Sequence, residues 1–363
     1  MSPVKALRGA VEAGRLLPDP AQAAVAGRLE ALGEAVEAWD GRRKALFRKT
    51  PEPPKGLYLW GGVGTGKSLL MDLFFDSVAV TRKRRAHFHA FMQDIHARIA
   101  VQREKKQAEP LIAVADQVAA ETRLLCFDEL QVTNVADAMI LGRLFERLFE
   151  AKVVVVATSN RVPGDLYKDG LNRPLFEPFI ALIENRLEVV NLDCGRDYRL
   201  ERLEAEPIHH SPLGPAADAA MDRAFDSLTF GAKPQSFSLT VQGREVTVPR
   251  EAAGVARFTF AELCERPLGP ADYLMIAETF HTVMIDGVPK MQAARRDAAA
   301  RFVTLIDALY EMKTKLVMSA DAEPQDLYPE GDGAFEFQRT ASRLMEMRSH
   351  DYLAAERRDT AKD

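Results

Sequence analysis

The segment with the strongest chemical signature is the octapeptide Gly61-Gly62-Val63-Gly64-Thr65-Gly66-Lys67-Ser68. Its spacing matches G-x-x-x-x-G-K-[ST], the pattern of a loop that binds the phosphates of a nucleoside triphosphate. The glycines let the backbone turn its N–H groups toward one point. Lys67 supplies a positive charge for the β- and γ-phosphates, and Ser68 supplies a hydroxyl for Mg²⁺. The octapeptide therefore predicts a site for a triphosphate and its magnesium ion.

The residues on both sides of the octapeptide support this interpretation. A phosphate loop requires a strand that runs into it and a helix that leaves it. An apolar run at 57–60 precedes the glycines, and the residues at 69–75 have a helical pattern. We therefore prefer a phosphate loop to the alternative, a glycine-rich surface turn that binds nothing.

Two adjacent carboxylates, Asp128 and Glu129, directly follow the apolar run 124–127. Such a run suits a strand that is buried on both faces of a parallel sheet. On a strand adjoining that of the phosphate loop, Asp128 is expected to hold Mg²⁺ through water, opposite Ser68. Glu129 is expected to orient and polarise the attacking water. The alternative is an acidic strand end that faces solvent.

Asn160 follows the next apolar run, at 153–157. A neutral amide at this strand end is expected to place the water between the γ-phosphate and Glu129, and an Asx turn is the alternative. Phosphoryl transfer also builds negative charge that an arginine offsets, in cis or from a neighbouring subunit. Of four candidate arginines we favour Arg173, because it opens a helix at an edge that another protomer could meet. The alternative is that Arg173 is an ordinary surface arginine. The candidates are Arg161, Arg173, Arg186 and Arg199.

Short apolar runs alternate with amphipathic stretches between residues 56 and 200, which indicates alternating strands and helices. Strands are expected at 57–60, 86–90, 124–129, 153–157 and 187–192. Helices are expected at 69–75, 91–107, 111–121, 136–150 and 173–185. This order predicts an α/β fold of the P-loop NTPase type, with a doubly wound parallel sheet that binds ligands at the carboxyl ends of its strands.

The remaining chain predicts one segment before this core and one domain after it. A helical period at 22–47 indicates an N-terminal helical segment within residues 1–55. After the core at 56–200, residues 209–215 are expected to form a loop and 216–228 a helix. A hairpin at 236–248 and strands at 282–286 and 315–319 around a helix at 293–312 predict a mixed α/β domain at 201–363. The stretch from Ser159 to Tyr167 recurs, one residue longer, as Ser319 to Tyr328, but the second copy lacks the asparagine at its strand end.

Composition bounds the remaining possibilities. The chain has 363 residues, of which 47% are hydrophobic and 28% charged, as in soluble globular proteins. Its net charge of −5 gives no global basic field, so no nucleic-acid partner is expected, and the basic run 82–85 is interpreted as a solvated turn. The three cysteines, at 126, 194 and 264, have neither disulfide nor zinc spacing. No run has the length and apolarity of a membrane span, and the first residues do not resemble a signal peptide, so we expect a cytoplasmic protein.

His87-Phe88-His89 has the alternation of a strand, which would place both histidines on one face. Two histidines with this spacing raise the possibility of a metal site. Because no third ligand is visible, we prefer a hydrogen-bonded structural pair.

Taken together, several motifs resemble the AFG-one-like branch of the AAA+ ATPases. They are the phosphate loop with residues 56–60, the segments 87–92, 127–132, 158–161 and 176–180, and, beyond the core, 197–199, 267–273, 280–283 and 339–344. The resemblance covers nearly the whole chain. It implies Mg²⁺-dependent ATP hydrolysis, assembly into a ring or partial ring, and action on a protein client, either division-ring proteins in bacteria or proteins being turned over in mitochondria.

The same resemblance assigns roles to single residues. Lys67 and Ser68 correspond to the phosphate-loop pair, Asp128 and Glu129 to the Walker B acids, Asn160 to the sensor and Arg173 to the arginine finger. One departure concerns the AAA+ lid, which is a helical bundle with a second sensor arginine. The mixed α/β pattern after residue 200 gives no position for that arginine.

Three functions remain open at this stage. The first is an ATP-driven remodelling enzyme, the second a nucleotide-dependent scaffold with little turnover, and the third a small-molecule kinase, which would not need Glu129. ATP is favoured over GTP, because no N-K-x-D segment is present. Asp19 and Gln22 are candidates for contact with the base, with an ordinary helix cap as the alternative.

Overall fold

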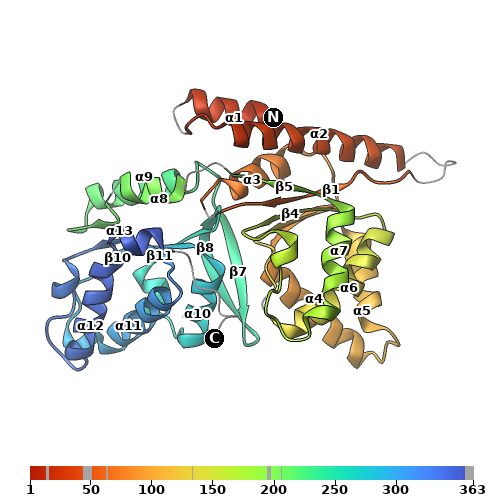
Figure 1. Ribbon diagram of the computed structural model, residues 1–363. Coiled ribbons are helices and arrows are strands. Elements are labelled where there is room, and N and C mark those ends of the chain that lie inside the picture. The colour runs from red at the N-terminus through yellow and green to blue at the C-terminus, as the bar shows by residue number, and fades with distance from the viewer. Residues whose placement is uncertain are drawn as a thin grey trace. The chain divides into compact units, whose positions relative to one another are not determined.

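The structure is a computed structural model that describes residues 1–13, 16–43, 51–62, 64–132, 134–193, 198–205 and 207–355. Its contacts divide the chain into two units, residues 1–197 and residues 198–360 (Figure 1). Each unit contains one sheet covered by helices. None of the helices in the described ranges has the length and apolarity needed to cross a membrane.

The first unit contains a five-stranded, entirely parallel sheet, which confirms the predicted fold class. Its strands lie in the order β2-β3-β4-β1-β5. They are β1 (Gly56–Trp60), β2 (Lys83–His87), β3 (Leu124–Asp128), β4 (Val154–Ser159) and β5 (Leu187–Asn191). The expectation that β3 adjoins the phosphate-loop strand β1 is wrong, because β4 pairs with both and lies between them.

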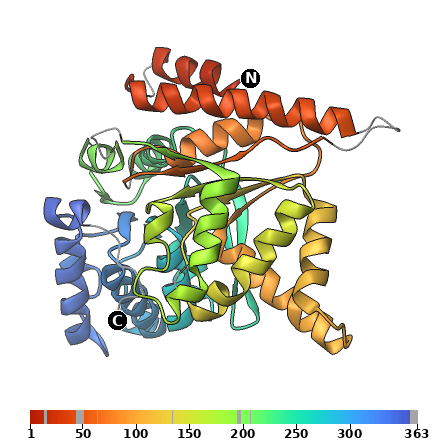
Figure 2. The same cartoon turned by 45° about the vertical axis from the view of Figure 1, so that its right-hand side comes forward.

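Helices cover both faces of this sheet (Figures 1 and 2). On one side lie α1 (Pro3–Glu12), α2 (Pro20–Arg43) and α3 (Lys67–Ser77), and on the other lie α4 (Phe88–Glu104), α5 (Pro110–Glu121), α6 (Val135–Glu150) and α7 (Glu177–Arg186). The core on the second side centres on Phe127 of β3, whose ring meets Phe88, Phe91 and Phe145 at centroid distances of 4.8–5.8 Å. This packing holds β3 in place and therefore fixes the position of its carboxyl end.

The expected strand at 86–90 is wrong. Strand β2 covers Lys83–His87 and α4 begins at Phe88, so His87 ends the strand and His89 lies exposed in the first turn of the helix. The two histidines therefore do not share a strand face. The helical spacing of Phe88, Phe91, Met92 and Ile95, all buried, outweighs the short alternation. The basic run is no solvated turn either, since most of it forms β2.

The second unit contains a six-stranded mixed sheet in the order β6-β11-β10-β9-β8-β7. Its strands are β6 (His209–His210), β7 (Gln235–Val241), β8 (Arg244–Ala252), β9 (Val255–Thr259), β10 (Thr282–Val288) and β11 (Lys315–Ala320). The β7–β8 pair is antiparallel and confirms the predicted hairpin, whereas β9, β10, β11 and β6 are parallel. His209 and His210 were expected in a loop but pair with β11 as a short strand.

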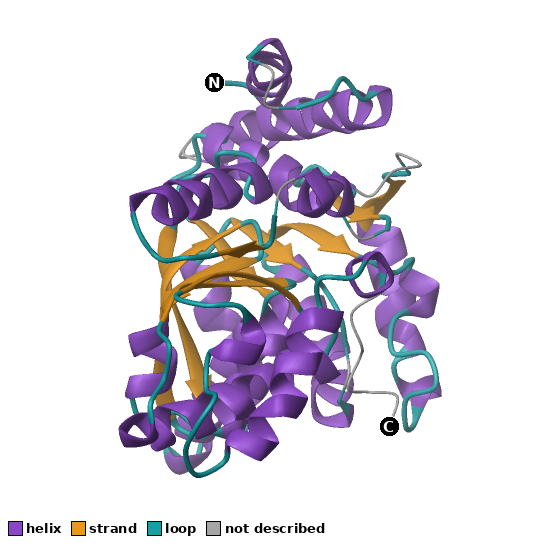
Figure 3. Cartoon of the chain, turned by 90° about the vertical axis from the view of Figure 1, so that its left-hand side faces the viewer, coloured by secondary structure: helices purple, strands orange, loops and turns teal. Residues whose placement is uncertain are grey.

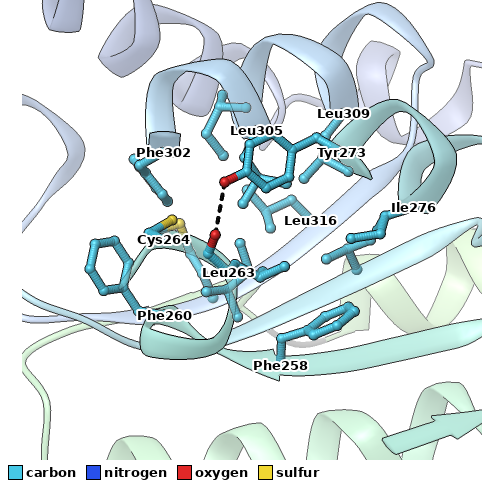
Figure 4. Packing of buried hydrophobic residues seen from close by; sticks show 14 of the residues in the cluster. Phe258, Phe260, Leu263, Cys264, Tyr273, Ile276, Phe302, Leu305, Leu309 and Leu316 are labelled. Carbon is cyan, nitrogen blue, oxygen red and sulfur yellow. Dashed lines mark hydrogen bonds between the residues drawn. The ribbon is translucent and has the colours of Figure 1, made fainter. Parts of the chain in front are cut away.

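The second unit also combines its strands with helices, and Figure 3 shows the helices of the chain in purple and the strands in orange. The helices of the second unit are α8 (Tyr198–Ala205), α9 (Pro215–Leu228), α10 (Pro270–Thr279), α11 (Arg296–Glu311), α12 (Ala334–Glu346) and α13 (His350–Ala354). In the core formed with α10 and α11, the Tyr273 hydroxyl donates to the Leu263 carbonyl at 2.8 Å (Figure 4). A buried hydroxyl requires such a partner, and burial raises the pKa of Tyr273.

The second unit repeats the central framework of the first. Strands β9-β10-β11-β6 have the same order and direction as β2-β3-β4-β1. Helix α11, strand β11 and the 3-10 turn Pro324–Asp326 have the same lengths and the same spacing along the chain as α6, β4 and the 3-10 turn Pro163–Asp165. After both turns a tyrosine hydroxyl, that of Tyr167 or Tyr328, donates at 2.9 Å to a carbonyl four residues later. The internal resemblance is therefore structural.

The register of this repeat differs from the predicted one. The Glu129 N–H donates to Thr158 Oγ1 at 3.1 Å, and the Gly287 N–H donates to Ser319 Oγ at 2.9 Å. Ser319 thus corresponds to Thr158 and not to Ser159, so that no residue is inserted. The position of Asn160 is then occupied by Asp321, so the second copy lacks the asparagine at its strand end.

The second unit keeps this framework without the phosphate loop. Only Ser211-Pro212-Leu213-Gly214 separates β6 from α9, with no lysine at the start of the helix. Gly287 stands at the position of Glu129, and both residues have a positive φ, 74° and 51°. The carboxylate expected to act on water is therefore absent from the second copy.

Candidate active site

The octapeptide forms the predicted connection between a strand and a helix. Strand β1 ends at Trp60 and α3 begins at Lys67, with Gly66 at its N-cap at φ 92°. A Cβ atom on Gly61 would lie 2.3 Å from the Leu192 carbonyl oxygen, so this close backbone approach requires glycine. Val63 lies outside the described residues. The first turn of α3, including Ser68, begins at the loop, where helix N–H groups attract anions.

Lys67 is buried and turned back onto its own loop. Its Nζ donates to the carbonyl oxygens of Gly61 at 2.9 Å and Gly62 at 2.5 Å. These main-chain acceptors hold the ammonium group inside the loop. A phosphate that entered the loop would offer a charged acceptor in their place.

Gln22 of α2 contacts the loop from outside it. Its Nε2 donates to the Thr65 carbonyl at 2.9 Å, and a Cβ on Gly66 would lie 2.6 Å from the same nitrogen. Asp19 Oδ1 accepts from the N–H groups of Ala21 at 2.7 Å and Gln22 at 3.1 Å. Asp19 thus caps α2, and Gln22 binds the loop backbone.

Asp128 ends β3 as a buried carboxylate with an arginine partner that sequence reasoning missed. Arg85 of β2 donates from Nε to Asp128 Oδ2 at 2.6 Å and from Nη2 to Asp128 Oδ1 at 3.2 Å. Burial lowers the pKa of Arg85, but the charges of Asp128 and Asp72 outweigh this effect and raise it overall. Only the pairing of β2 with β3, in which His87 lies opposite Asp128, reveals this contact, because it places Arg85 two residues from the partner of Asp128.

Glu129 occupies a tight turn that the end of β4 holds in place. Its φ of 51° is uncommon for a residue other than glycine. Thr158 accepts the Glu129 N–H through its hydroxyl and the Leu130 N–H through its carbonyl at 2.7 Å, and Ser159 Oγ donates to the Leu130 carbonyl at 2.8 Å. Thr158 and Ser159 are thus positioning residues that sequence reasoning also missed.

We expect Thr158→Val to disturb this turn. The change removes the acceptor of the Glu129 N–H and should lower the free energy of unfolding by about 1–3 kcal/mol. Turnover should fall as well, because the Glu129 backbone loses its anchor. Thr279→Val is the matched control, since its hydroxyl donates only to the Met275 carbonyl of its own helix. Denaturant unfolding and phosphate release measure both effects, and unchanged turnover in Thr158→Val would contradict the assigned role.

Asn160 and Arg173, the other two predicted site residues, have different surroundings. Asn160 is exposed directly after β4, at the sheet edge where β1 and β3 also end. Arg173 begins a 3-10 turn, Arg173–Leu175, ahead of α7 and not the helix itself. Its guanidinium donates to the carbonyls of Leu166 at 2.7 Å and Gly164 at 2.6 Å. The structure therefore collects Lys67, Ser68, Asp128, Glu129 and Asn160 at one edge, whereas Arg173 is bound to its own backbone segment.

The donor set fits Mg²⁺. This ion prefers oxygen ligands, keeps several waters and is bound through one or two carboxylates plus substrate phosphates. Ser68 and the buried Asp128 supply one hydroxyl and one carboxylate. Within the described ranges no cluster of three or more His, Cys, Asp or Glu side chains could hold a metal by itself. A site that is completed by a triphosphate agrees with both observations.

Comparison with known proteins gives a consistent family signal. The profile of the family described as AFG1-like ATPase matches residues 1–356. The chain is 40% identical over 304 residues to cell division protein ZapE of Escherichia coli strain K12, covering 84% of this chain and 80% of ZapE. It is 41% identical over 348 residues to lactation elevated protein 1 homolog B of Danio rerio, covering 83% of this chain and 69% of that protein. Among solved structures, domain III of the replication initiation protein DnaA from Thermotoga maritima matches with a TM-score of 0.35 and 14% identity, covering 60% of this chain and 77% of that one.

Proposed function

Because the chain belongs to the AFG1-like ATPase family and is an ATPase, we propose that it couples Mg²⁺-dependent ATP hydrolysis to the remodelling of a protein partner. The observation that carries this proposal is that the parallel strands β1, β3 and β4 all end at one edge of the first sheet. There β1 leads through the glycine loop into α3, and β3 ends at Asp128, directly before Glu129, whose N–H is bound by Thr158 of β4.

Each residue at this edge has a chemical task in the proposed reaction. The loop N–H groups and Lys67 bind the triphosphate, and Ser68 and Asp128 would hold Mg²⁺. When bound, the ion neutralises charge on the phosphates. Glu129 accepts a proton from the attacking water, which Asn160 orients. Arg173, in a neighbouring subunit of a ring or partial ring, offsets the charge that develops on the transferred phosphoryl group.

The cellular task is proposed from the relatives. ZapE carries the name of a cell division protein and matches 84% of this chain, which supports a role in division. A cytoplasmic location and a division-ring protein as client complete the proposal. The alternative is a scaffold that recruits division proteins in a nucleotide-dependent manner with little turnover. A small-molecule kinase is less compatible with the site, because Glu129 beside Asp128 suits activation of water; phosphate release without an added acceptor tests this point.

Lys67→Ala tests the proposed chemistry. A hydrogen bond to a charged group contributes about 1.5–3 kcal/mol, so we expect ATP to bind about ten- to a hundredfold more weakly and phosphate release to fall. Binding and release should be measured with ATP and with GTP, and we expect ATP to be preferred. Lys290→Ala, at an exposed lysine of the second unit, is the control. Wild-type hydrolysis in Lys67→Ala would rule out the phosphate-loop assignment.

A further inference from the structure

Arg85 joins the two parts of the candidate magnesium site. Besides its two hydrogen bonds to Asp128, it donates from Nη1 to Asp72 Oδ1. Asp72 lies on α3, one helical turn after Ser68, and Asp128 ends β3. One guanidinium on β2 thus connects the helix that carries the hydroxyl ligand with the strand that carries the carboxylate.

The second unit contains the same three-residue arrangement in the repeated framework. Arg257 of β9 donates from Nε to Asp286 Oδ2 at 2.7 Å and from Nη2 to Asp286 Oδ1 at 3.1 Å, and from Nη1 to Asp222 Oδ1 at 2.7 Å. Asp286 lies on β10, and Asp222 lies on α9, the counterpart of α3. Asp128 pairs with His87 of β2, and Asp286 pairs with Thr259 of β9. In each sheet the arginine lies two residues before the residue that pairs with the aspartate. The same atoms of the guanidinium make the same bonds.

The two arrangements differ in what surrounds them. In the second unit no lysine or glycine loop precedes α9 and Gly287 replaces the second acid, so the Arg257 arrangement joins sheet and helix without the groups of a triphosphate site. In the first unit the strand carboxylate is also the candidate metal-holding group, with its side chain only 6% exposed. A carboxylate this buried requires a charged or hydrogen-bonded partner.

We propose that Arg85 is a positioning residue of the ATPase site, which sets the orientation of Asp128 and its spacing from Ser68 for magnesium binding. Each carboxylate oxygen has two lone pairs, so each retains one for a metal-bound water after Arg85 has donated to it. Partners that orient metal ligands in this way typically change metal affinity 10–100-fold when they are removed. The Arg257 arrangement provides a comparison in which the same hydrogen bonds form without the groups of a triphosphate site.

The test compares Arg85→Gln with Arg257→Gln in the full-length protein. Binding of a fluorescent, non-hydrolysable ATP analogue is measured in EDTA and across a Mg²⁺ titration, with thermal unfolding in parallel. We expect Arg85→Gln to raise the Mg²⁺ concentration at half-saturation by about 10–100-fold and to leave binding in EDTA unchanged. Arg257→Gln should lose stability but keep the wild-type Mg²⁺ dependence.

Other outcomes would overturn this inference. If Arg85→Gln needs the same Mg²⁺ concentration for half-saturation as the wild type, Arg85 has a structural role only. If it needs less Mg²⁺, Arg85 weakens magnesium binding instead of supporting it. If Arg85→Gln does not fold, Arg85→Lys keeps the charge but lacks the planar fork that holds both oxygens of Asp128, and it should still require more Mg²⁺. The inference rests on the proposed function, and the two fail differently: wild-type protein whose analogue binding ignores Mg²⁺ would contradict the function itself.

Discussion

Glu129→Gln is expected to lower the rate of ATP hydrolysis by about 10²–10⁴-fold, the usual contribution of a positioned general base. Glutamine preserves the size of the side chain but cannot accept a proton from water. The backbone hydrogen bond from residue 129 to Thr158 does not depend on the side chain, so the turn should persist. ATP binding should therefore remain at the wild-type level, and single-turnover phosphate release together with equilibrium binding separates the two quantities.

Glu177→Gln is the matched control, because Glu177 is an exposed glutamate at the start of α7. It should hydrolyse ATP at the wild-type rate. The same pair of variants distinguishes the remodelling enzyme from the scaffold. A scaffold would retain its role in division with Glu129→Gln, whereas an enzyme that acts through hydrolysis would lose it. Near-normal turnover in Glu129→Gln would remove this residue from the chemistry.

Features encoded by local pattern could be predicted from the sequence. The phosphate loop depends on the spacing of glycines and lysine within eight residues, and its strand and helix follow from the adjacent apolar runs. The hairpin was also predictable, because Gln242 and Gly243 lie between two runs of alternating polarity. In the structure both residues adopt the positive φ of a hairpin turn, 48° and 79°. The buried β3 and β4 appeared as unbroken apolar runs because helices cover both faces of the sheet.

The errors arose where residues distant in sequence decide the outcome. No local pattern places β4 between β1 and β3, because strand order depends on pairings across the whole sheet. For the same reason Arg85 resembled one of four basic residues in a turn, although β2 pairing directs it to Asp128. Thr158 resembled part of a strand end, and only the turn at Glu129 shows what its hydroxyl binds.

The repeated framework separates fold from chemistry within one chain. Both units keep the arginine between a helix and a strand aspartate and the strand-end hydroxyl that accepts a backbone N–H. Only the first adds the glycine loop, Lys67 and Glu129. The shared groups therefore stabilise the architecture in both units and, in the first, also hold Asp128 and Glu129 in place, whereas the added groups are those that a triphosphate and water require.

Arg173→Ala is expected to lower turnover by about 10³–10⁵-fold, the contribution of an arginine finger. Two of the five guanidinium N–H groups are engaged by the carbonyls of Gly164 and Leu166, which orient the group and leave three donors for a phosphate. Leu171 and Leu175, on both sides of Arg173, are 69% and 67% exposed. Association of copies through this segment would bury the apolar surface of these two leucines, as a finger that acts between subunits requires.

Mixing two inactive variants tests whether the finger acts between subunits. Arg173→Ala retains an intact phosphate loop, and Lys67→Ala retains Arg173, so mixed assemblies contain sites with both groups. We expect the mixture to release phosphate faster than either variant alone, and the wild-type rate per subunit to rise with protein concentration. Arg186→Ala, at an exposed arginine of α7, should hydrolyse ATP normally. Because a finger within the same chain cannot be supplied by a partner, a mixture as inactive as its components would exclude action in trans.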